Sequence, residues 1–147
     1  MPADLDPRAL MRAQATAALG TTMDGAPYVS LVLVAFDADG SPLLLLSRLA
    51  QHTRNLLADP RVSLLFDGTA GLEDPLTGPR LTVMGAAAVL ADPQARARYV
   101  ARHPSAELYA GFSDFDLYRV TIERGHLVAG FGKIRWVEAG ELRDAST

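Results

Sequence analysis

The segment of residues 46–56 concentrates groups that can bind an anion. It reads as the end of a strand followed by the first turns of a helix, with Ser47 placed to cap that helix. Free backbone N–H groups at a helix start favour a phosphate or carboxylate, and the helix dipole adds to that preference. Further donor side chains follow at Arg48, His52, Thr53 and Arg54. The alternative is an ordinary capped surface helix whose basic side chains are solvated.

Two later segments carry a second set of candidates. Arg80 opens an otherwise apolar strand, from which a guanidinium can reach a planar or anionic ligand. A solvated or ion-paired arginine is the alternative. In residues 130–136, Phe131 stands between two glycines, which lets the backbone approach another group closely. Trp136, the only tryptophan, is either a core or interface anchor or a ligand contact.

Arrangements of side chains that catalyse reactions unaided are missing from the sequence. His52, His103 and His126 show no spacing typical of a metal site, and the absence of cysteine excludes thiolate catalysis and cysteine-bound metals. Ser30 and Ser47 lack the context of a hydrolase nucleophile. Residues 68–71 match neither a P-loop nor a dinucleotide fingerprint. Any reaction therefore depends on a cofactor, and no metal site is expected.

Length and charge narrow the class of protein. The 147 residues suit one domain, residues 1–147. The net charge is −3 with scattered Lys and Arg, which argues against binding to nucleic acid or an anionic membrane. The acidic N-terminus does not resemble a signal peptide, and no apolar run is long enough to span a bilayer. The expectation is a cytoplasmic protein.

Hydrophobic patterning predicts many short strands with a few helices between them. Helices are expected at residues 7–19, 49–59, 92–102 and 105–109. Strands are expected at 21–23, 28–36, 42–46, 61–67, 80–91, 116–124 and 126–129, with a hairpin turn at 24–25, a bulge or a point of close approach at Gly85, a turn at 125–126 and a polar tail from 137. The helices are too few and too irregular for a doubly wound sheet. The fold class is mainly β: an antiparallel β-barrel with peripheral helices.

Several segments, in this order, resemble a known family. They are residues 27–32, 47–56, 59–65, 74–77 with 79–85, 114–119 and 130–132. Together they resemble the pyridoxamine 5'-phosphate oxidase-like FMN-binding split barrels, most closely the heme-utilisation (HugZ-like) branch. The likeness covers about residues 16–137.

The resemblance implies a six-stranded split barrel that forms a homodimer with two FMN sites at the interface. It places the flavin along Ser30, Leu31 and Val32, and the ribityl phosphate beside Ser47 and the helix that follows. Arg80 falls at the isoalloxazine edge, and Phe131 and Lys133 in a segment that reaches the other subunit's flavin. The complete cofactor-binding set is Ser30, Leu31, Val32, Ser47, Arg48, Leu49, Gln51, His52, Thr53, Asn55, Arg80, Phe131 and Lys133.

The function implied is an FMN-dependent oxidoreductase that exchanges hydride or electrons at flavin N5 with a small substrate or NAD(P)H. Arg80 would then stabilise negative charge on the reduced flavin. One alternative is a heme-binding protein with His52 as the ligand, and another is a non-catalytic dimeric module. Residues 137–147 hold one Arg and no His, which disfavours oxidation of vitamin B6. The lack of a histidine-bearing C-terminal extension disfavours heme oxygenation.

Overall fold

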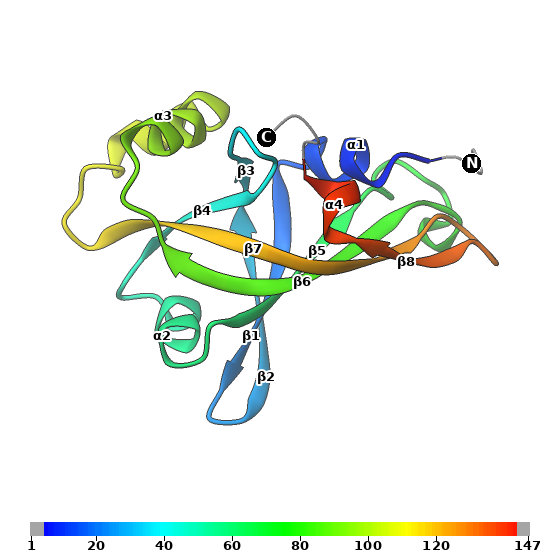
Figure 1. The fold of residues 1–147 in the computed structure, drawn as a ribbon, viewed down its shortest axis with the longest axis horizontal. Helices are drawn as coiled ribbons and strands as arrows, with labels where there is room; N and C mark the ends of the chain where they lie inside the picture. Colours follow the sequence, from blue (N-terminus) through cyan, green and yellow to red (C-terminus); the bar gives the residue numbers. More distant parts are fainter. Residues whose placement is uncertain (1–4, 144–147) are drawn as a thin grey trace.

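Strands and short helices alternate along the chain. The computed structural model describes residues 5–143, whose arrangement is shown in Figure 1. The helices are α1 (Pro7–Arg12), α2 (Gln51–Ala58), α3 (Pro93–Arg102) and α4 (Ala139–Leu142), with the 3-10 turns η1 (Pro75–Thr77) and η2 (Pro104–Leu108). The strands are β1 (Thr16–Met23), β2 (Ala26–Leu33), β3 (Ala35–Phe36), β4 (Pro42–Ser47), β5 (Arg61–Asp67), β6 (Arg80–Val89), β7 (Phe115–Val128) and β8 (Ile134–Glu138).

The strands form one antiparallel sheet that curls into a split barrel. Its order is β2-β1-β5-β6-β7-β4-β3, and β8 pairs with the second half of β7. The curl brings β2, at one edge, close to β4 near the other edge (Figure 1), but no ladder joins them within residues 5–143. The mainly β fold class is confirmed. The sheet contains eight strands rather than six.

The concave face of the sheet holds the main hydrophobic core. Alternate residues of β1, β5 and β6 are buried there, as the period of two in a strand requires. Tyr118, Val120 and Ile122, at alternate positions of β7, share that face. A smaller core lies on the other side of the sheet, where Tyr99 of α3 packs with Leu117. Thus α3 covers the convex face at one end, while many convex side chains of β2, β5, β6 and β8 stay exposed.

The opening helix is shorter than the composition of residues 7–19 predicts. α1 ends at Arg12, and the rest of that segment enters β1. Ala17 and Leu19 are buried at alternate positions of this strand, which pairs with β2 and β5. Good helix formers lie in a strand here because core burial and sheet pairing outweigh local propensity.

β7 runs through the turn that was predicted at residues 125–126, so that prediction is wrong. Pairing with β6 supports the strand along its whole length, and the predicted irregularity at Gly85 is confirmed, because β7 carries one extra residue, Glu123, opposite that point. The chain turns instead at Gly130 and Gly132, both at positive φ. Residues 126–128 of the predicted last strand form the end of β7. A further strand, β8, follows and takes up the start of the predicted polar tail, of which residues 144–147 lie outside the described residues.

The other predicted elements are present with adjusted ends. The hairpin turn at Asp24 and Gly25 has positive φ at both residues, as a tight two-residue turn requires. The predicted strand 28–36 divides into β2 and β3. α3 begins after Asp92, whose carboxylate accepts the N–H of Gln94.

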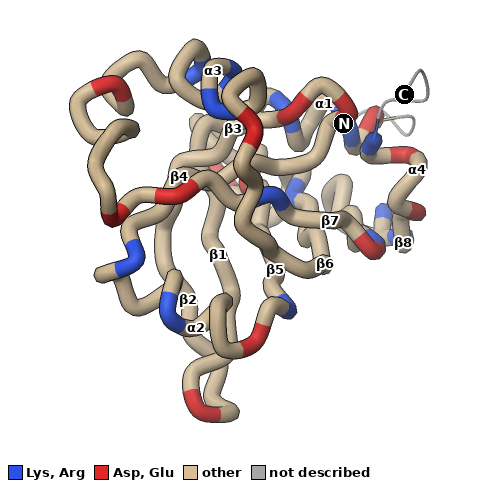
Figure 2. Tube along the Cα trace, turned by 60° about the vertical axis from the view of Figure 1, so that its left-hand side comes forward, with Lys and Arg blue, Asp and Glu red and all other residues tan. Residues whose placement is uncertain are grey.

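Charged residues of both signs are scattered along the described chain. Figure 2 shows Lys and Arg at separate places between Asp and Glu rather than in one continuous run. Among residues 5–143, no helix has the length and apolar character needed to cross a membrane.

Candidate functional site

A hollow of about 280 Å³ opens in the split of the barrel, between β2 and the end of β4. The start of α2 bounds it on one side. The predicted residues Leu31, Val32, Ser47 and His52 line it. Within the described residues β2 pairs with β1 alone, so its other edge carries unpaired backbone N–H and C=O groups. The hollow therefore combines an apolar slot with free backbone donors and acceptors.

The first turn of α2 presents uncapped N–H groups beside this hollow. Ala50 precedes the helix, no side chain of the described residues bonds to the first-turn N–H groups, and the turn contains no acidic residue. Such a helix start attracts an anion through its free donors and its dipole. The prediction that Ser47 caps α2 is wrong, because Ser47 ends β4 three positions before Ala50.

Ser47 is bonded to the start of β7 instead. Its hydroxyl donates to Asp114 Oδ2 at 2.6 Å and accepts the N–H of Leu49 at 3.1 Å. A hydroxyl has one proton, and Asp114 takes it. Ser47 therefore shapes the junction of β4 and α2 but has no donor left for an anionic ligand.

Arg48 ties the same junction to the same segment. Its guanidinium bonds to the Asp116 carboxylate and to the Ser113 carbonyl, and its backbone N–H donates to the Asp114 carbonyl at 2.7 Å. The charge of Arg48 is thus already paired. The neighbouring Leu49 is largely exposed.

His52 joins α2 to β2. Its Nδ1 lies 2.9 Å from the Ser30 hydroxyl oxygen. Burial lowers the pKa of His52, which favours the neutral ring at neutral pH. The second ring nitrogen is then the atom that can meet a ligand.

Three further predicted residues lie on α2. Two of them hold the helix on the sheet through hydrogen bonds, and the third has an unbonded hydroxyl. Gln51 donates to Asn55 Oδ1 at 2.8 Å, and Asn55 donates to the hydroxyl of Thr21 in β1 at 3.0 Å, so this pair fixes α2 on the sheet. Thr53 is fully buried, and its Oγ1 has no hydrogen-bond partner among residues 5–143. A buried hydroxyl left in that state costs about 1–3 kcal/mol, which a ligand oxygen can offset.

Arg80, Phe131 and Lys133 lie away from this group within one copy of the chain. Arg80 pairs with Val128 at the far end of β7 and donates to the carbonyls of Leu76 and Gly78. Phe131 and Lys133 occupy the turn from β7 to β8, where Lys133 borders a second hollow of about 260 Å³. These three residues lie at one end of β7, and the residues beside α2 lie at the other end. The two ends of β7 are roughly 40 Å apart at the usual rise per residue. One copy of the chain does not bring the predicted site residues together.

Sequence reasoning missed three aromatic residues of the hollow: Tyr99, Tyr109 and Phe115. The rings of Tyr109 and Phe115 lie 4.9 Å apart, and burial raises the pKa of Tyr99 above its usual value. They come from α3, the segment after η2 and the start of β7. Their spacing in the sequence carried no signal, because only the tertiary packing of α3 beside β4 brings them to β2.

Residues 5–143 contain no group of three or more His, Cys, Asp or Glu side chains arranged to hold a metal ion. His103 is engaged elsewhere, since its Nε2 bonds to the Val34 carbonyl at 2.8 Å in a buried position. His126 lies on the convex face against Trp136. Of these three histidines, His52 is the one that borders the hollow in the barrel split.

Comparison with known sequences identifies relatives over most of the chain. A family model described as Pyridoxamine 5'-phosphate oxidase matches residues 7–129. A curated relative, "Non-canonical heme oxygenase HOZ, chloroplastic" of Arabidopsis thaliana, is 39% identical over 110 residues. That alignment covers 73% of this chain but 33% of the relative, so this chain spans about a third of that protein's length.

Solved structures share the fold closely. A heme binding protein from Mycobacterium smegmatis has a TM-score of 0.84 and 28% identity, covering 97% of this chain and 60% of that one. HutZ, a heme storage protein from Vibrio cholerae, has a TM-score of 0.74 over 88% of this chain and 96% of its own; at 24% identity it shows the fold alone.

Proposed function

Because the chain belongs to the pyridoxamine 5'-phosphate oxidase family, we propose that it binds FMN in the barrel split and serves as an oxidoreductase. The observation that carries this proposal is the first turn of α2. Uncapped N–H groups, no acidic side chain and the buried free hydroxyl of Thr53 fit a ligand phosphate. Neutral His52, held by Ser30, adds one more polar contact at the same place.

The rest of the hollow suits a planar ring. The free edge of β2 at residues 31–33 offers N–H and C=O groups to a heterocycle's polar edge, and Tyr109 and Phe115 offer apolar contact. A bound flavin would supply hydride and electron transfer for a small substrate or NAD(P)H. The protein's own part would be to orient the ring and to limit access of water.

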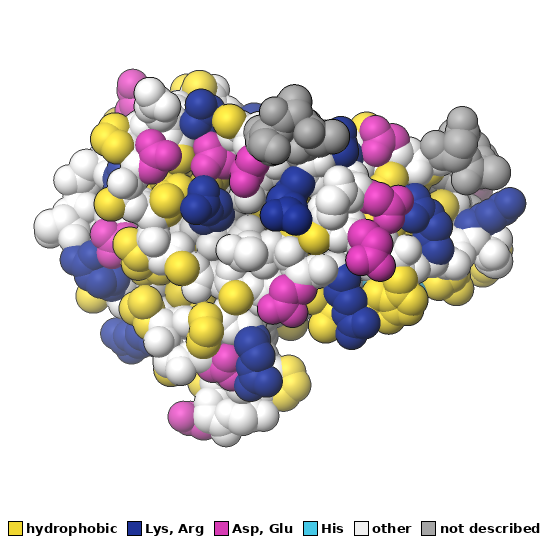
Figure 3. All heavy atoms as spheres, in the orientation of Figure 1, with side chains coloured by type: hydrophobic (Ala, Val, Ile, Leu, Met, Phe, Trp, Pro, Cys, Tyr) yellow, Lys and Arg dark blue, Asp and Glu magenta, His cyan; other side chains and the backbone are white. Residues whose placement is uncertain are grey.

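We extend the proposal to a homodimer. Arg80, Phe131 and Lys133 lie far from the α2 site in one copy, so they reach it only from a second copy. The convex face provides the surface: large apolar side chains are exposed there on β2, β5, β6 and β8, and some gather beneath β8 (Figure 3). In such a dimer the second copy's Arg80 would place positive charge at the ring.

Heme binding is the second candidate. It is favoured by the named relatives, one a heme oxygenase and another a heme binding protein, and by His52, whose neutral ring borders the apolar hollow. A neutral imidazole nitrogen is a common iron ligand. The apolar slot accommodates part of a porphyrin as readily as part of a flavin.

Absorption spectroscopy distinguishes the two candidates. We expect the visible bands of FMN to shift and sharpen on addition of the protein, and the shift to weaken in Thr53→Val. Thr53→Ser, which keeps the hydroxyl, is the matched control. An unchanged FMN spectrum together with a hemin Soret shift that disappears in His52→Ala would overturn the flavin proposal and support heme binding.

A further inference from the structure

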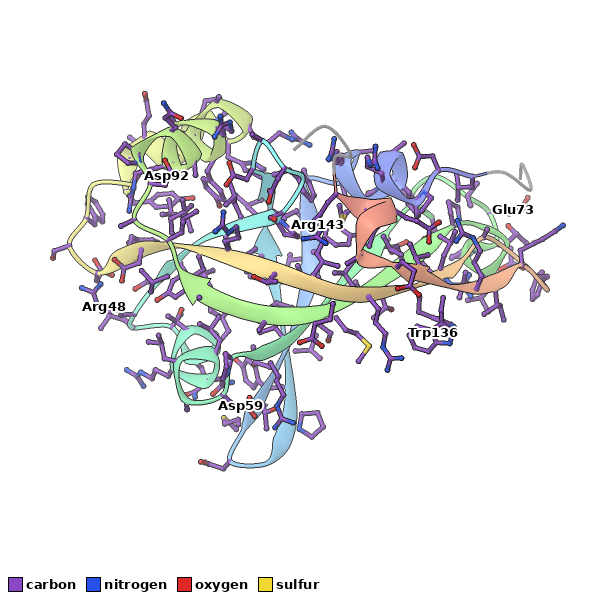
Figure 4. The ribbon with its side chains drawn as sticks, in the orientation of Figure 1. Arg48, Asp59, Glu73, Asp92, Trp136 and Arg143 are labelled. Atoms are coloured by element: carbon purple, nitrogen blue, oxygen red, sulfur yellow. The ribbon has the colours of Figure 1, made fainter. Side chains whose placement is uncertain are left out.

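Two tyrosines bring hydroxyl groups to the wall of the hollow in the barrel split. Tyr99 comes from α3 and Tyr109 from the segment after η2. Figure 4 shows this end of the molecule, with Asp92 at the start of α3 and Arg48 before the start of α2. The Tyr99 hydroxyl lies near the backbone of Leu45, two positions before the end of β4 and so about 7 Å farther from α2. The tyrosines therefore lie beyond the proposed phosphate position.

Both rings are held in place without a ligand. Tyr99 is 2% exposed, and its ring lies 5.2 Å from that of His103. His103 is fixed in turn by its bond to the Val34 carbonyl. Tyr109 is half-buried, and its ring packs on Phe115. Because folding has already ordered these side chains, a ligand that meets them restricts few further rotamers.

The two hydroxyls can donate a hydrogen bond into the hollow. Burial raises the pKa of Tyr99, the neighbouring Tyr109 raises it further, and a backbone contact at Leu45 opposes only part of the shift, so the phenol keeps its proton. Within residues 5–143 no carboxylate bonds to either hydroxyl. Each phenol has one proton and can also accept one, so if one donates to the other, one proton stays free to donate.

The surroundings of this donor determine which ligand it suits. Leu31, Leu33 and Leu45 line the hollow with the tyrosines and provide no side-chain acceptor. A planar ring with a carbonyl at its edge supplies the missing acceptor. A ring without one leaves the donor unpaired in an apolar slot, which disfavours its binding.

We infer that Tyr109 and Tyr99 determine specificity at this site by selecting a planar ligand that carries a carbonyl at its edge. Tyr109, the more exposed of the two, donates to the carbonyl oxygen. Tyr99 is a positioning residue that holds the Tyr109 hydroxyl toward the hollow. The inference rests on the proposed function for its ligand, FMN, whose ring bears carbonyl groups. It adds a ring contact that is separate from the phosphate contact at α2.

Two ligands and a set of single substitutions test the inference. Lumiflavin has the ring of FMN without the ribityl phosphate, so it reports the ring contacts alone. We expect Tyr109→Phe to weaken the binding of both ligands by about three- to tenfold, and Tyr99→Phe to weaken both by less. Thr53→Val should weaken FMN alone. Tyr28→Phe removes a hydroxyl outside the hollow and should match wild type.

The absorption spectrum of bound FMN separates a hydrogen bond from a structural effect. Loss of a donor to a ring carbonyl shifts the visible bands, so we expect a shift in Tyr109→Phe, a smaller one in Tyr99→Phe and none in Thr53→Val. Wild-type affinity and unchanged bands in Tyr109→Phe would overturn the inference and leave the proposed function standing. If wild type binds lumiflavin as tightly as FMN, the phosphate contact is refuted and Tyr109→Phe still decides the inference. No binding of either ligand refutes both.

Discussion

The contact between His52 and Ser30 places a titratable group at the centre of the site. Burial lowers the pKa of His52, so between its folded-state pKa and the unfolded value of about 6.5 the unfolded chain binds more protons. The contribution of His52 to stability is therefore complete above about pH 6.5 and is lost as the pH falls toward the folded-state pKa.

From this linkage we predict that His52→Asn reduces the loss of unfolding free energy between pH 7.5 and pH 5.5. Asparagine keeps a polar group near Ser30 but does not titrate. Urea unfolding of both proteins at the two pH values measures the effect. Equal losses in wild type and variant would show that His52 is not held neutral.

The hydrogen bond between Ser47 and Asp114 leads to a second prediction at this scale. Asp114→Ala removes the acceptor of the Ser47 proton, and the 2.6 Å contact is partly buried. We expect about 1.5–3 kcal/mol of destabilisation, the usual range for a charge-assisted bond. Asp114→Asn keeps one acceptor oxygen and should lose less. Chemical denaturation that finds Asp114→Ala as stable as wild type contradicts this assignment.

Residue types alone indicated the anion-binding character of residues 46–56 but not the individual roles. Ser47 has the type and the position of a helix cap, yet its hydroxyl is bonded to Asp114, 67 residues later in the chain. Gln51 and Asn55 look like ligand donors but fasten α2 to β1. Such partners are set by tertiary folding, so no local pattern carries them.

At the scale of elements, the patterns that succeeded were those with a local physical cause. The turn at Asp24 and Gly25 needs positive φ, and the shift in register between β6 and β7 coincides with Gly85. The predicted helix fails at Ala17 and Leu19, because burial in β1 outweighs their helix propensity. The predicted turn fails at Gly125, because pairing with β6 continues β7 through this residue.

The irregularity at Gly85 gives a prediction for the sheet. A Cβ at this position would lie 2.1 Å from the Thr121 carbonyl oxygen, a backbone atom that cannot move without shifting β7. We expect Gly85→Ala to destabilise the fold by about 1–3 kcal/mol, as overpacking of a core does. Gly111→Ala is the control, because no atom lies within 4 Å of its added Cβ. Thermal unfolding that ranks the two variants equally would refute this account of Gly85.

The predicted site residues lie at two opposite ends of the molecule. They can form one site only if two copies of the chain associate, so the oligomeric state decides whether the site is complete. Leu65 is 40% exposed at the middle of the convex face, outside the ligand hollow. We predict that Leu65→Lys yields monomers, since the proposed convex-face interface is apolar and would bury the lysine of each copy without an ion-pair partner. Sedimentation over a range of concentrations measures this. Leu108→Lys, exposed at the end covered by α3, should remain dimeric. A Leu65→Lys dimer would place the interface elsewhere.

The most direct test of the central claim is the affinity of the wild-type protein for FMN compared with riboflavin, measured by quenching of flavin fluorescence. The two ligands differ only in the phosphate that the start of α2 is proposed to bind. The account predicts that FMN binds at least about tenfold more tightly, a difference of about 1.4 kcal/mol, and that Thr53→Val reduces this ratio. Equal affinities for the two ligands, or no binding of either, would contradict it.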